Sequence, residues 1–333
     1  MIKKILNYSL IISLLIVISP LFCFGQAGLN GNFLELTISP RNPEPMQNVK
    51  VTLNSSFYDL NRSKITWLVN GVEKKTEMGL KEFTVQAGKN GSKTIIKTLV
   101  ETQNDGLREI ETSFIPSVVD LVYESLSYTP PFYKGKTLNP NQGVVLVTAI
   151  PELIKNTGEK ISAKNLIYSW KKDGKVQQTV SGLGKNVFVF SGTVPIRDIV
   201  IDVTVSSIEG DITAFKQTTI TNVSPKIIFY ENSPIYGIMM NKAITNPVNM
   251  LTDEFNVLAV PYFFSASYAN TPDLDYAWSM NGNTVSTQDP KNSFTTRIDT
   301  PGSGTANIGL KISNNVRIFQ FVDNNYSINF NKQ

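Results

Sequence analysis

The chain has 333 residues, of which 41% are hydrophobic and 17% charged, and it contains no histidine and a single cysteine. Without histidine it cannot form a Ser-His-Asp or Cys-His catalytic group or an imidazole metal site. One cysteine can form neither an intrachain disulfide nor a thiolate zinc site. The remaining composition is that of a globular protein long enough for two or three hydrophobic cores.

An export signal is predicted at the start of the chain. Lys3 and Lys4 form a basic head, and residues 5–24 are mostly apolar and end close to small residues before Gln26. This order is typical of a secretory signal peptide, and we assign it to residues 1–25.

Two alternatives to cleavage stay open. Residues 5–24 could remain as a membrane anchor, because about 20 apolar residues span a bilayer. The chain could also be a lipoprotein acylated at Cys23, although the bulky Phe22 before it is atypical of that pattern. All three interpretations predict export. Loss of the leader with its two lysines would lower the formal net charge from +4 to +2, which gives no basis for nucleic-acid or anionic-membrane binding.

The three tryptophans lie in the same local frame. Trp67, Trp170 and Trp278 each begin the pattern W-x-x-[ND]-G, at spacings of 103 and 108 residues. One third of the chain beyond the signal has nearly this length, so we interpret the sequence as three copies of one module. Prolines that interrupt continuing strands mark the boundaries. The predicted domains are residues 31–116, 117–223 and 224–330.

Each predicted module repeats the same order of β-type segments. An apolar run precedes the tryptophan, a short strand around a phenylalanine follows it, and an alternating β-branched run comes next. Short strands separated by turn residues, in repeats of about 100 residues, are typical of β-sandwiches. In chain order the segments are 49–53, Phe83 and 94–100; then 144–151, Phe188 and 199–205; then 255–261, Phe294 and 306–312.

The tryptophan frame resembles strand C and its turn in immunoglobulin-like domains, and the Tyr-x-Trp core of bacterial PKD modules. Tyr168 and Tyr276 supply the tyrosine of the second and third copies. The resemblance implies that Trp67, Trp170 and Trp278 fill the space between two sheets. The chain departs from immunoglobulin domains in lacking their cysteine pair, and from PKD modules in the residues that follow the tryptophan.

The expected fold is therefore all-β: three tandem Ig/PKD-like antiparallel β-sandwich domains behind an N-terminal signal peptide. As a whole, the chain resembles exported tandem-sandwich proteins of bacteria. Because this superfold hosts many functions, the resemblance implies architecture and not activity.

Two aromatic turns are the first candidate site. Tyr128, Phe132 and Tyr133 lie near the start of the second predicted module, and Tyr236 near the start of the third, beside prolines that stiffen the chain. Exposed rings there could stack on sugars, which would make the chain a carbohydrate-binding module array. The same rings could instead wedge neighbouring modules together. Both interpretations stay open.

Asp273 and Asp275 are weak calcium candidates, because alternate residues of a strand face the same way. A solvated loop before Trp278 explains them equally well. Glycoside hydrolysis is a third interpretation; it would require two carboxylates facing each other across a cleft, and a structure without such a pair would reject it. No catalytic residue and no cofactor are expected.

The sequence thus predicts a non-enzymatic protein of the cell envelope or surface, acting as a spacer, scaffold or adhesion element. Its expected location is extracellular, at the cell surface or facing the periplasm, with the membrane contacted only through the N-terminal segment. Its expected partners are envelope or surface proteins, bound by strand-edge pairing. Carbohydrate is the alternative ligand, and nucleic acid is not expected.

Overall fold

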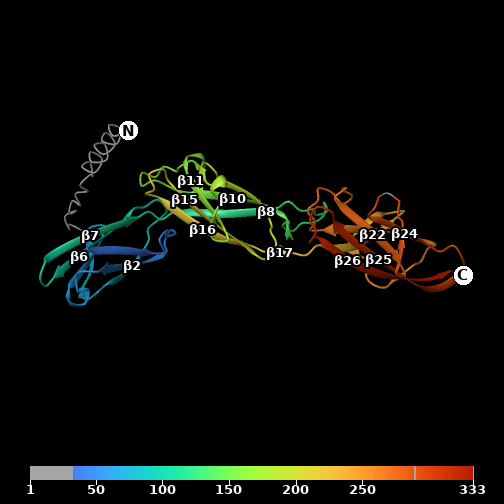
Figure 1. Cartoon of the computed structure of the whole chain (residues 1–333), viewed down its shortest axis with the longest axis horizontal. Coiled ribbons are helices and arrows are strands. Elements are labelled where there is room, and N and C mark those ends of the chain that lie inside the picture. The colour runs from blue at the N-terminus through green and yellow to red at the C-terminus, as the bar shows by residue number, and fades with distance from the viewer. Residues whose placement is uncertain (1–32, 289, 333) are drawn as a thin grey trace, which may run out of the picture. The chain divides into compact units, whose positions relative to one another are not determined.

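The computed structural model describes residues 33–332 except residue 289 (Figure 1). The predicted signal peptide, membrane anchor and Cys23 lie outside the described residues. Strands dominate the described chain, and its helical segments are short 3-10 turns. None of the described helices is long and apolar enough to cross a membrane.

The described chain divides into two compact units. One consists of residues 33–38, Val51–Phe83 and Ile96–Thr112. The other consists of Ser39–Lys50, Thr84–Ile95 and the chain from Ser113 onward. The second unit therefore holds the whole of the second and third tryptophan-centred regions.

Two sheets surround the first tryptophan in the chain. One has the strand order β1-β2-β5 and the other the order β4-β3-β6-β7. Strand β3, which carries Trp67, pairs antiparallel with β4 and β6. The strands are β1 (Leu34–Ser39), β2 (Asn48–Ser55), β3 (Lys64–Val69), β4 (Val72–Met78), β5 (Glu82–Gln86), β6 (Thr94–Thr102) and β7 (Gly106–Phe114).

The second sandwich encloses a continuous hydrophobic core. Its sheets have the orders β14-β10-β8 and β12-β11-β15-β16, with β13 also paired to β11. Alternate residues of β10 and β15 point into the core, because successive side chains of a strand face opposite sides. The strands are β8 (Val118–Ser125), β10 (Val144–Glu152), β11 (Ile167–Lys172), β12 (Lys175–Val176), β13 (Gly182–Leu183), β14 (Val187–Ser191), β15 (Ile199–Ser206) and β16 (Thr213–Ile220).

The third sandwich repeats this arrangement. Its sheets have the orders β19-β18-β21-β24 and β20-β26-β25-β22-β23, and its core lies between them. The strands are β18 (Lys226–Ser233), β19 (Gly237–Ala243), β20 (Val248–Asn249), β21 (Glu254–Tyr262), β22 (Leu274–Met280), β23 (Asn283–Val285), β24 (Ser293–Arg297), β25 (Gly302–Asn314) and β26 (Phe321–Lys332). The all-β fold of antiparallel β-sandwiches expected from the sequence is confirmed.

The three tryptophans are buried and have equivalent surroundings. Trp67, Trp170 and Trp278 are at most 1% exposed. The indole N–H of each donates to a backbone carbonyl at 2.8–2.9 Å, and each ring lies against one phenylalanine at 5.0–5.7 Å between centroids. The carbonyls belong to Leu80, Lys185 and Lys291, and the phenylalanines are Phe83, Phe188 and Phe294.

The Asn/Asp-Gly pair of each repeat forms a two-residue hairpin turn. Asn70, Asp173 and Asn281 all have φ near +50°, and the glycines that follow have φ of +76° to +85°. A type I′ turn requires positive φ at both central residues, which asparagine, aspartate and glycine tolerate best. The side chain adds a second constraint, because Asp173 Oδ1 accepts from Val200 N at 3.1 Å and Asn281 Oδ1 accepts from Asn307 N at 2.8 Å. The repeated motif is therefore explained by folding.

Candidate functional site

The aromatic turn that follows β8 packs against the first strands of the third sandwich. Tyr230, Val260, Tyr262 and Phe263 form a buried cluster separate from the sandwich cores. Three of the rings singled out in the sequence, Tyr128, Phe132 and Tyr133, are half-buried against it. We call these seven residues the junction cluster.

The rings of the junction cluster meet edge to face. Phe132 lies 5.6 Å from Tyr230 at 80° between ring planes. Tyr133 lies 6.0 Å from Tyr262 at 74° and 5.8 Å from Phe263 at 79°. This geometry places the positive edge of one ring on the negative face of the next, which stabilises aromatic pairs beyond their burial. The packing therefore fixes ring orientation as well as contact.

Two backbone hydrogen bonds join the sandwiches at the same place. The N–H of Tyr128 donates to the carbonyl of Phe264 at 2.7 Å, and the N–H of Phe263 donates to the carbonyl of Tyr128 at 3.1 Å. Phe263 adopts φ of +60°, which is unfavourable for a bulky residue. The surrounding contacts hold this conformation, which turns the chain out of β21 so that it can pair with Tyr128.

A tyrosine pair completes the junction cluster. The hydroxyls of Tyr230 and Tyr262 are 3.1 Å apart and hydrogen-bonded to each other. Burial, followed by the hydrogen bond to Tyr230, raises the pKa of Tyr262 well above its ordinary value. The hydroxyl of Tyr262 therefore remains protonated at neutral pH and cannot act there as a base.

A second, polar seam joins the two sandwiches through Gln320. This side chain is fully buried and donates from Nε2 to the carbonyl of Asn141 and to Ser265 Oγ. Its Oε1 accepts from the N–H of Ser265 at 2.7 Å. Nearby, Asn141 Nδ2 donates to the carbonyl of Phe319 at 3.2 Å. A buried amide with its groups satisfied in this way is costly to replace.

Tyr236, the fourth ring predicted for the ligand site, lies elsewhere. It is 77% exposed in the turn between β18 and β19, and it makes no ring contact with any described residue. Its N–H donates to Ser233 Oγ at 3.3 Å. The structure therefore brings three of the four predicted rings together at a junction, and these four rings do not line one surface.

The predicted calcium candidates flank the start of β22. Asp273 and Asp275 are exposed on either side of the buried Leu274. The backbone carbonyl of Asp273 accepts from Asn315 N at 2.9 Å. Within residues 33–288 and 290–332, no group of three or more acidic or cysteine side chains is placed to hold a metal ion.

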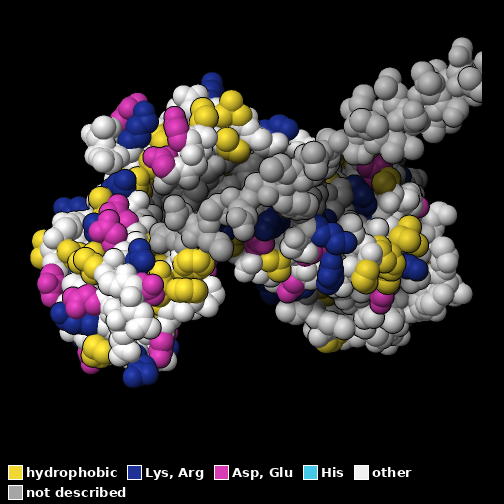
Figure 2. Space-filling model, turned by 60° about the vertical axis from the view of Figure 1, so that its left-hand side comes forward, with side chains coloured by type: hydrophobic (Ala, Val, Ile, Leu, Met, Phe, Trp, Pro, Cys, Tyr) yellow, Lys and Arg dark blue, Asp and Glu magenta, His cyan; other side chains and the backbone are white. Residues whose placement is uncertain are grey.

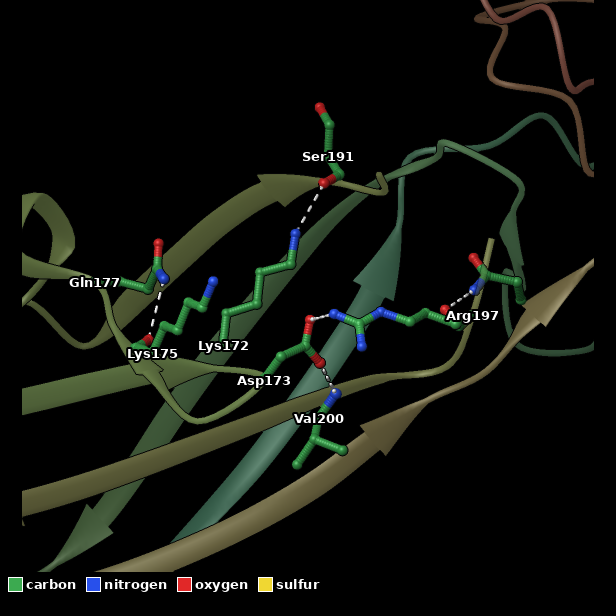
Figure 3. Close-up of polar contacts among 8 residues, drawn as sticks. Lys172, Asp173, Lys175, Gln177, Ser191, Arg197 and Val200 are labelled. Atoms are coloured by element: carbon green, nitrogen blue, oxygen red, sulfur yellow. Dashed lines mark hydrogen bonds and ion pairs between the residues drawn. The ribbon is translucent and has the colours of Figure 1, made fainter. Parts of the chain in front are cut away.

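A dense set of polar contacts surrounds Asp173 at the β11–β12 turn (Figure 3). Asp173 Oδ2 pairs with Arg197 at 3.0 Å, while Lys172 donates to the carbonyl of Ser191 at 3.2 Å and lies 4.6 Å from the ring of Phe190. Burial lowers the pKa of Lys172. The positive charge of Arg197 also lowers this pKa, whereas the negative charge of Asp173 raises it. Because these groups are engaged with one another, we assign this set to holding the turn.

Charged side chains do not gather by sign on the face shown in Figure 2, where lysine and arginine alternate with aspartate and glutamate. Most ion pairs among described residues include at least one exposed side chain, as in Lys64 with Glu101 at 3.2 Å. Surface pairs of this kind contribute little to stability. A mixed surface fits the small net charge of the chain.

No family model matches the chain, and no curated protein does. Among solved structures it is similar to a fibronectin-III array of RIM-binding protein, at 13% identity and a TM-score of 0.30, over 90% of this chain and 96% of that one. It is also similar to fibronectin(III)-like modules of Clostridium thermocellum CbhA, at 14% identity and a TM-score of 0.26, over 56% and 94%.

A third similar structure is the glucan-utilization protein SGBP-B of Bacteroides ovatus in complex with a mixed-linkage heptasaccharide. Its identity is 12% and its TM-score 0.20, over 89% of this chain and 70% of that one. At such scores these likenesses carry no argument about function.

Proposed function

We propose that the chain is an exported, non-enzymatic scaffold or spacer of a bacterial cell envelope or surface, in which the second and third sandwiches form one stiff segment. The observation that carries this proposal is the junction cluster with its two backbone hydrogen bonds. Flexible linkers allow neighbouring domains to move independently, whereas a packed hydrophobic junction opposes that motion. A spacer needs such resistance to bending.

Partner binding belongs to the same proposal. Strands β14 and β24 lie at the edges of their sheets, and edge strands offer backbone groups to an added strand. Envelope or surface proteins are therefore the proposed partners. Attachment or export would depend on the N-terminal segment, as the sequence predicts.

Carbohydrate binding is the second candidate function. Tyr128, Phe132 and Tyr133 are committed to the junction cluster, and Tyr236 is the predicted ring that is largely exposed. A sugar site at this turn would thus depend on a single ring, which disfavours it relative to the spacer.

The stiffness of the junction between the second and third sandwiches can be measured by pulsed electron–electron double resonance on the full chain. Spin labels would be attached to cysteines introduced by Lys175→Cys and Asn283→Cys, two exposed positions, with Cys23→Ser to avoid labelling the native cysteine. We expect a narrow distance distribution. Tyr133→Ala combined with Phe263→Ala should broaden it, and Tyr236→Ala should not. A broad distribution in the otherwise native chain would refute the stiff spacer.

A further inference from the structure

A second aromatic cluster, in the other compact unit, is open to solvent. Phe57 is 60% exposed and stacks on Phe33 at 4.6 Å between ring centroids, with 23° between their planes. Tyr58 meets both rings edge-on, at 5.1 Å from Phe57 and 6.2 Å from Phe33. The junction cluster does not include these residues, and no local pattern in the sequence marks them.

The loop that carries these rings is held in a defined turn. Ser55 ends β2, and its Oγ accepts from the N–H of Phe57 at 3.1 Å and from the N–H of Tyr58 at 2.9 Å. Asp59 Oδ1 then accepts from Asn61 N at 3.1 Å, at the start of a 3-10 turn. These backbone hydrogen bonds and the stacking of Phe33 on one face restrain the ring of Phe57 before any ligand arrives. Such preorganisation lowers the entropic cost of binding.

Two polar hollows border the cluster, one lined in part by Phe33 and the other by Phe57 and Tyr58. One, of 410 Å³, includes Asn54 and Ser56 in its lining. The other, of 310 Å³, includes Arg62, Gln103 and Asn104. The side chains of these five residues make no hydrogen bond or ion pair with any residue in the described part of the chain. They are therefore available to bind a ligand.

An apolar ring flanked by unpaired hydrogen-bonding groups matches the surface of a sugar. A pyranose presents C–H groups on its face, which the negative face of an aromatic ring attracts, and hydroxyls around its rim. Ligand sites generally combine such an apolar platform with a few polar groups that fix orientation. A protein partner would usually need a much larger contact than one exposed ring.

Charge further restricts the ligand. Glu35, Asp59 and Asp105 line the two hollows, with Arg62 as the basic side chain among the lining residues. The formal negative excess disfavours an anionic ligand at this position. Among neutral sugars, β-1,4-linked glucose has its hydroxyls and both linkages equatorial, which leaves both ring faces apolar and keeps the chain extended.

The equivalent loop of the third sandwich is buried against the second sandwich instead of facing solvent. There the residues that follow β21, Phe263 and Phe264, are 7% and 0% exposed, and their backbone pairs with Tyr128. In the first tryptophan-centred region the loop after β2 leaves Phe57 exposed. Loops at one end of a sandwich are the usual place for binding residues, because a rigid scaffold positions them.

We infer that Phe33, Phe57 and Tyr58, with the polar groups beside them, form a binding site for a neutral, β-linked oligosaccharide. This site is distinct from the predicted rings Tyr128 and Tyr236. It does not depend on the spacer proposal, because it lies in a different compact unit and the stiffness measurement does not involve it.

The test is isothermal titration calorimetry of the full chain with cellohexaose, and with maltohexaose as the α-linked comparison. We expect cellohexaose to bind with a Kd of about 1 mM or tighter and maltohexaose to bind more weakly. Phe57→Ala should weaken cellohexaose binding at least about tenfold, which corresponds to 1.4 kcal/mol or more. Tyr236→Ala, the matched exposed-ring control, should leave the affinity within about twofold.

A second variant distinguishes a direct loss of binding from misfolding. Asn104→Ala alters an exposed side chain without a partner in the described chain, so it should reduce affinity about threefold or more while the melting temperature stays unchanged. Absence of binding to both sugars would overturn the proposal, as would cellohexaose binding that survives Phe57→Ala. Preference for maltohexaose that is lost in Phe57→Ala would support the sugar site and overturn the β-linkage. Self-association lost in Phe57→Ala, without sugar binding, would overturn the proposal by assigning these rings to protein contact.

Discussion

The indole N–H of Trp170 donates to the backbone carbonyl of Lys185 at 2.8 Å, and the same bond recurs at the other two tryptophans. The acceptor lies just before the strand whose phenylalanine packs on the indole ring. The tryptophan side chain thus fills the core, and its hydrogen bond fixes where the phenylalanine-bearing strand begins. This double role explains why the tryptophan recurs in a chain whose repeats otherwise differ.

Trp170→Ala should destabilise the second sandwich by about 3–5 kcal/mol, because a fully buried ring leaves a large cavity. Trp170→Phe keeps part of the volume but leaves the Lys185 carbonyl without its partner, which costs about 1–3 kcal/mol. Urea unfolding followed by circular dichroism measures both losses. Exposed Tyr236→Ala serves as the control. A loss below about 1 kcal/mol for Trp170→Ala would show that the ring is not part of the core.

The Asp173 turn predicts different effects for two substitutions. Asp173→Asn keeps an oxygen that accepts from Val200 N and tolerates positive φ, so it should lose only the exposed ion pair with Arg197, worth about 1 kcal/mol or less. Asp173→Ala removes the acceptor and disfavours positive φ, and should cost about 1–3 kcal/mol. Thermal unfolding of both variants checks this. Equal losses would assign the stability to the ion pair instead of the turn.

Gln320→Leu should weaken the seam between the second and third sandwiches. Leucine has a similar size but leaves the Asn141 carbonyl and the Ser265 N–H without partners, and each buried unpaired group costs about 1–3 kcal/mol. Differential scanning calorimetry should show the two sandwiches unfolding less cooperatively than in the native chain. The exposed amide variant Gln103→Leu is the matched control. An unchanged transition in Gln320→Leu would mean that the seam contributes nothing to coupling.

Stability should fall at alkaline pH because several buried tyrosines must remain protonated. Burial raises the pKa of Tyr168 to about 12, and its hydroxyl donates to the Ala163 carbonyl at 3.0 Å. The contribution is fully present below the ordinary tyrosine pKa near 10 and is lost as pH rises toward 12. Burial shifts the pKa of Tyr128, Tyr262, Tyr276 and Tyr326 in the same direction.

Urea unfolding at pH 8 and at pH 11 measures this dependence. Tyr168→Phe should be less stable than the native chain at pH 8, because a hydrogen bond is lost. It should nevertheless lose less stability between the two pH values, because one titrating group has been removed. An identical pH dependence in both proteins would show that Tyr168 does not titrate differently in the folded state.

Most of the fold could be predicted because its determinants are local and repeated. The period of Trp67, Trp170 and Trp278 marked three similar segments, and alternation of apolar residues marked β6, β15 and β25. The Asn/Asp-Gly pairs indicated hairpin turns because few residues adopt positive φ at both central positions. None of these inferences required contacts between residues distant in sequence.

The sites could be predicted only in part. The cluster of rings around Tyr128 and Tyr133 was visible in the sequence, but its role depended on whether Tyr230 and Tyr262 lay against it. Gln320 and Asn141 are ordinary polar residues 179 positions apart, and no sequence pattern relates them. Phe33 and Phe57 were likewise unremarkable until the fold stacked one ring on the other.

The sequence by itself determined the all-β class, the three tryptophan-centred repeats and the turns between their strands, because each depends on the chemistry of neighbouring residues. Only the tertiary structure decided which aromatic rings are buried at a junction and which remain open to a ligand. That choice depends on packing between strands far apart in the chain. Tyrosine therefore packs between two sandwiches at Tyr133, whereas at Tyr236 its ring remains exposed.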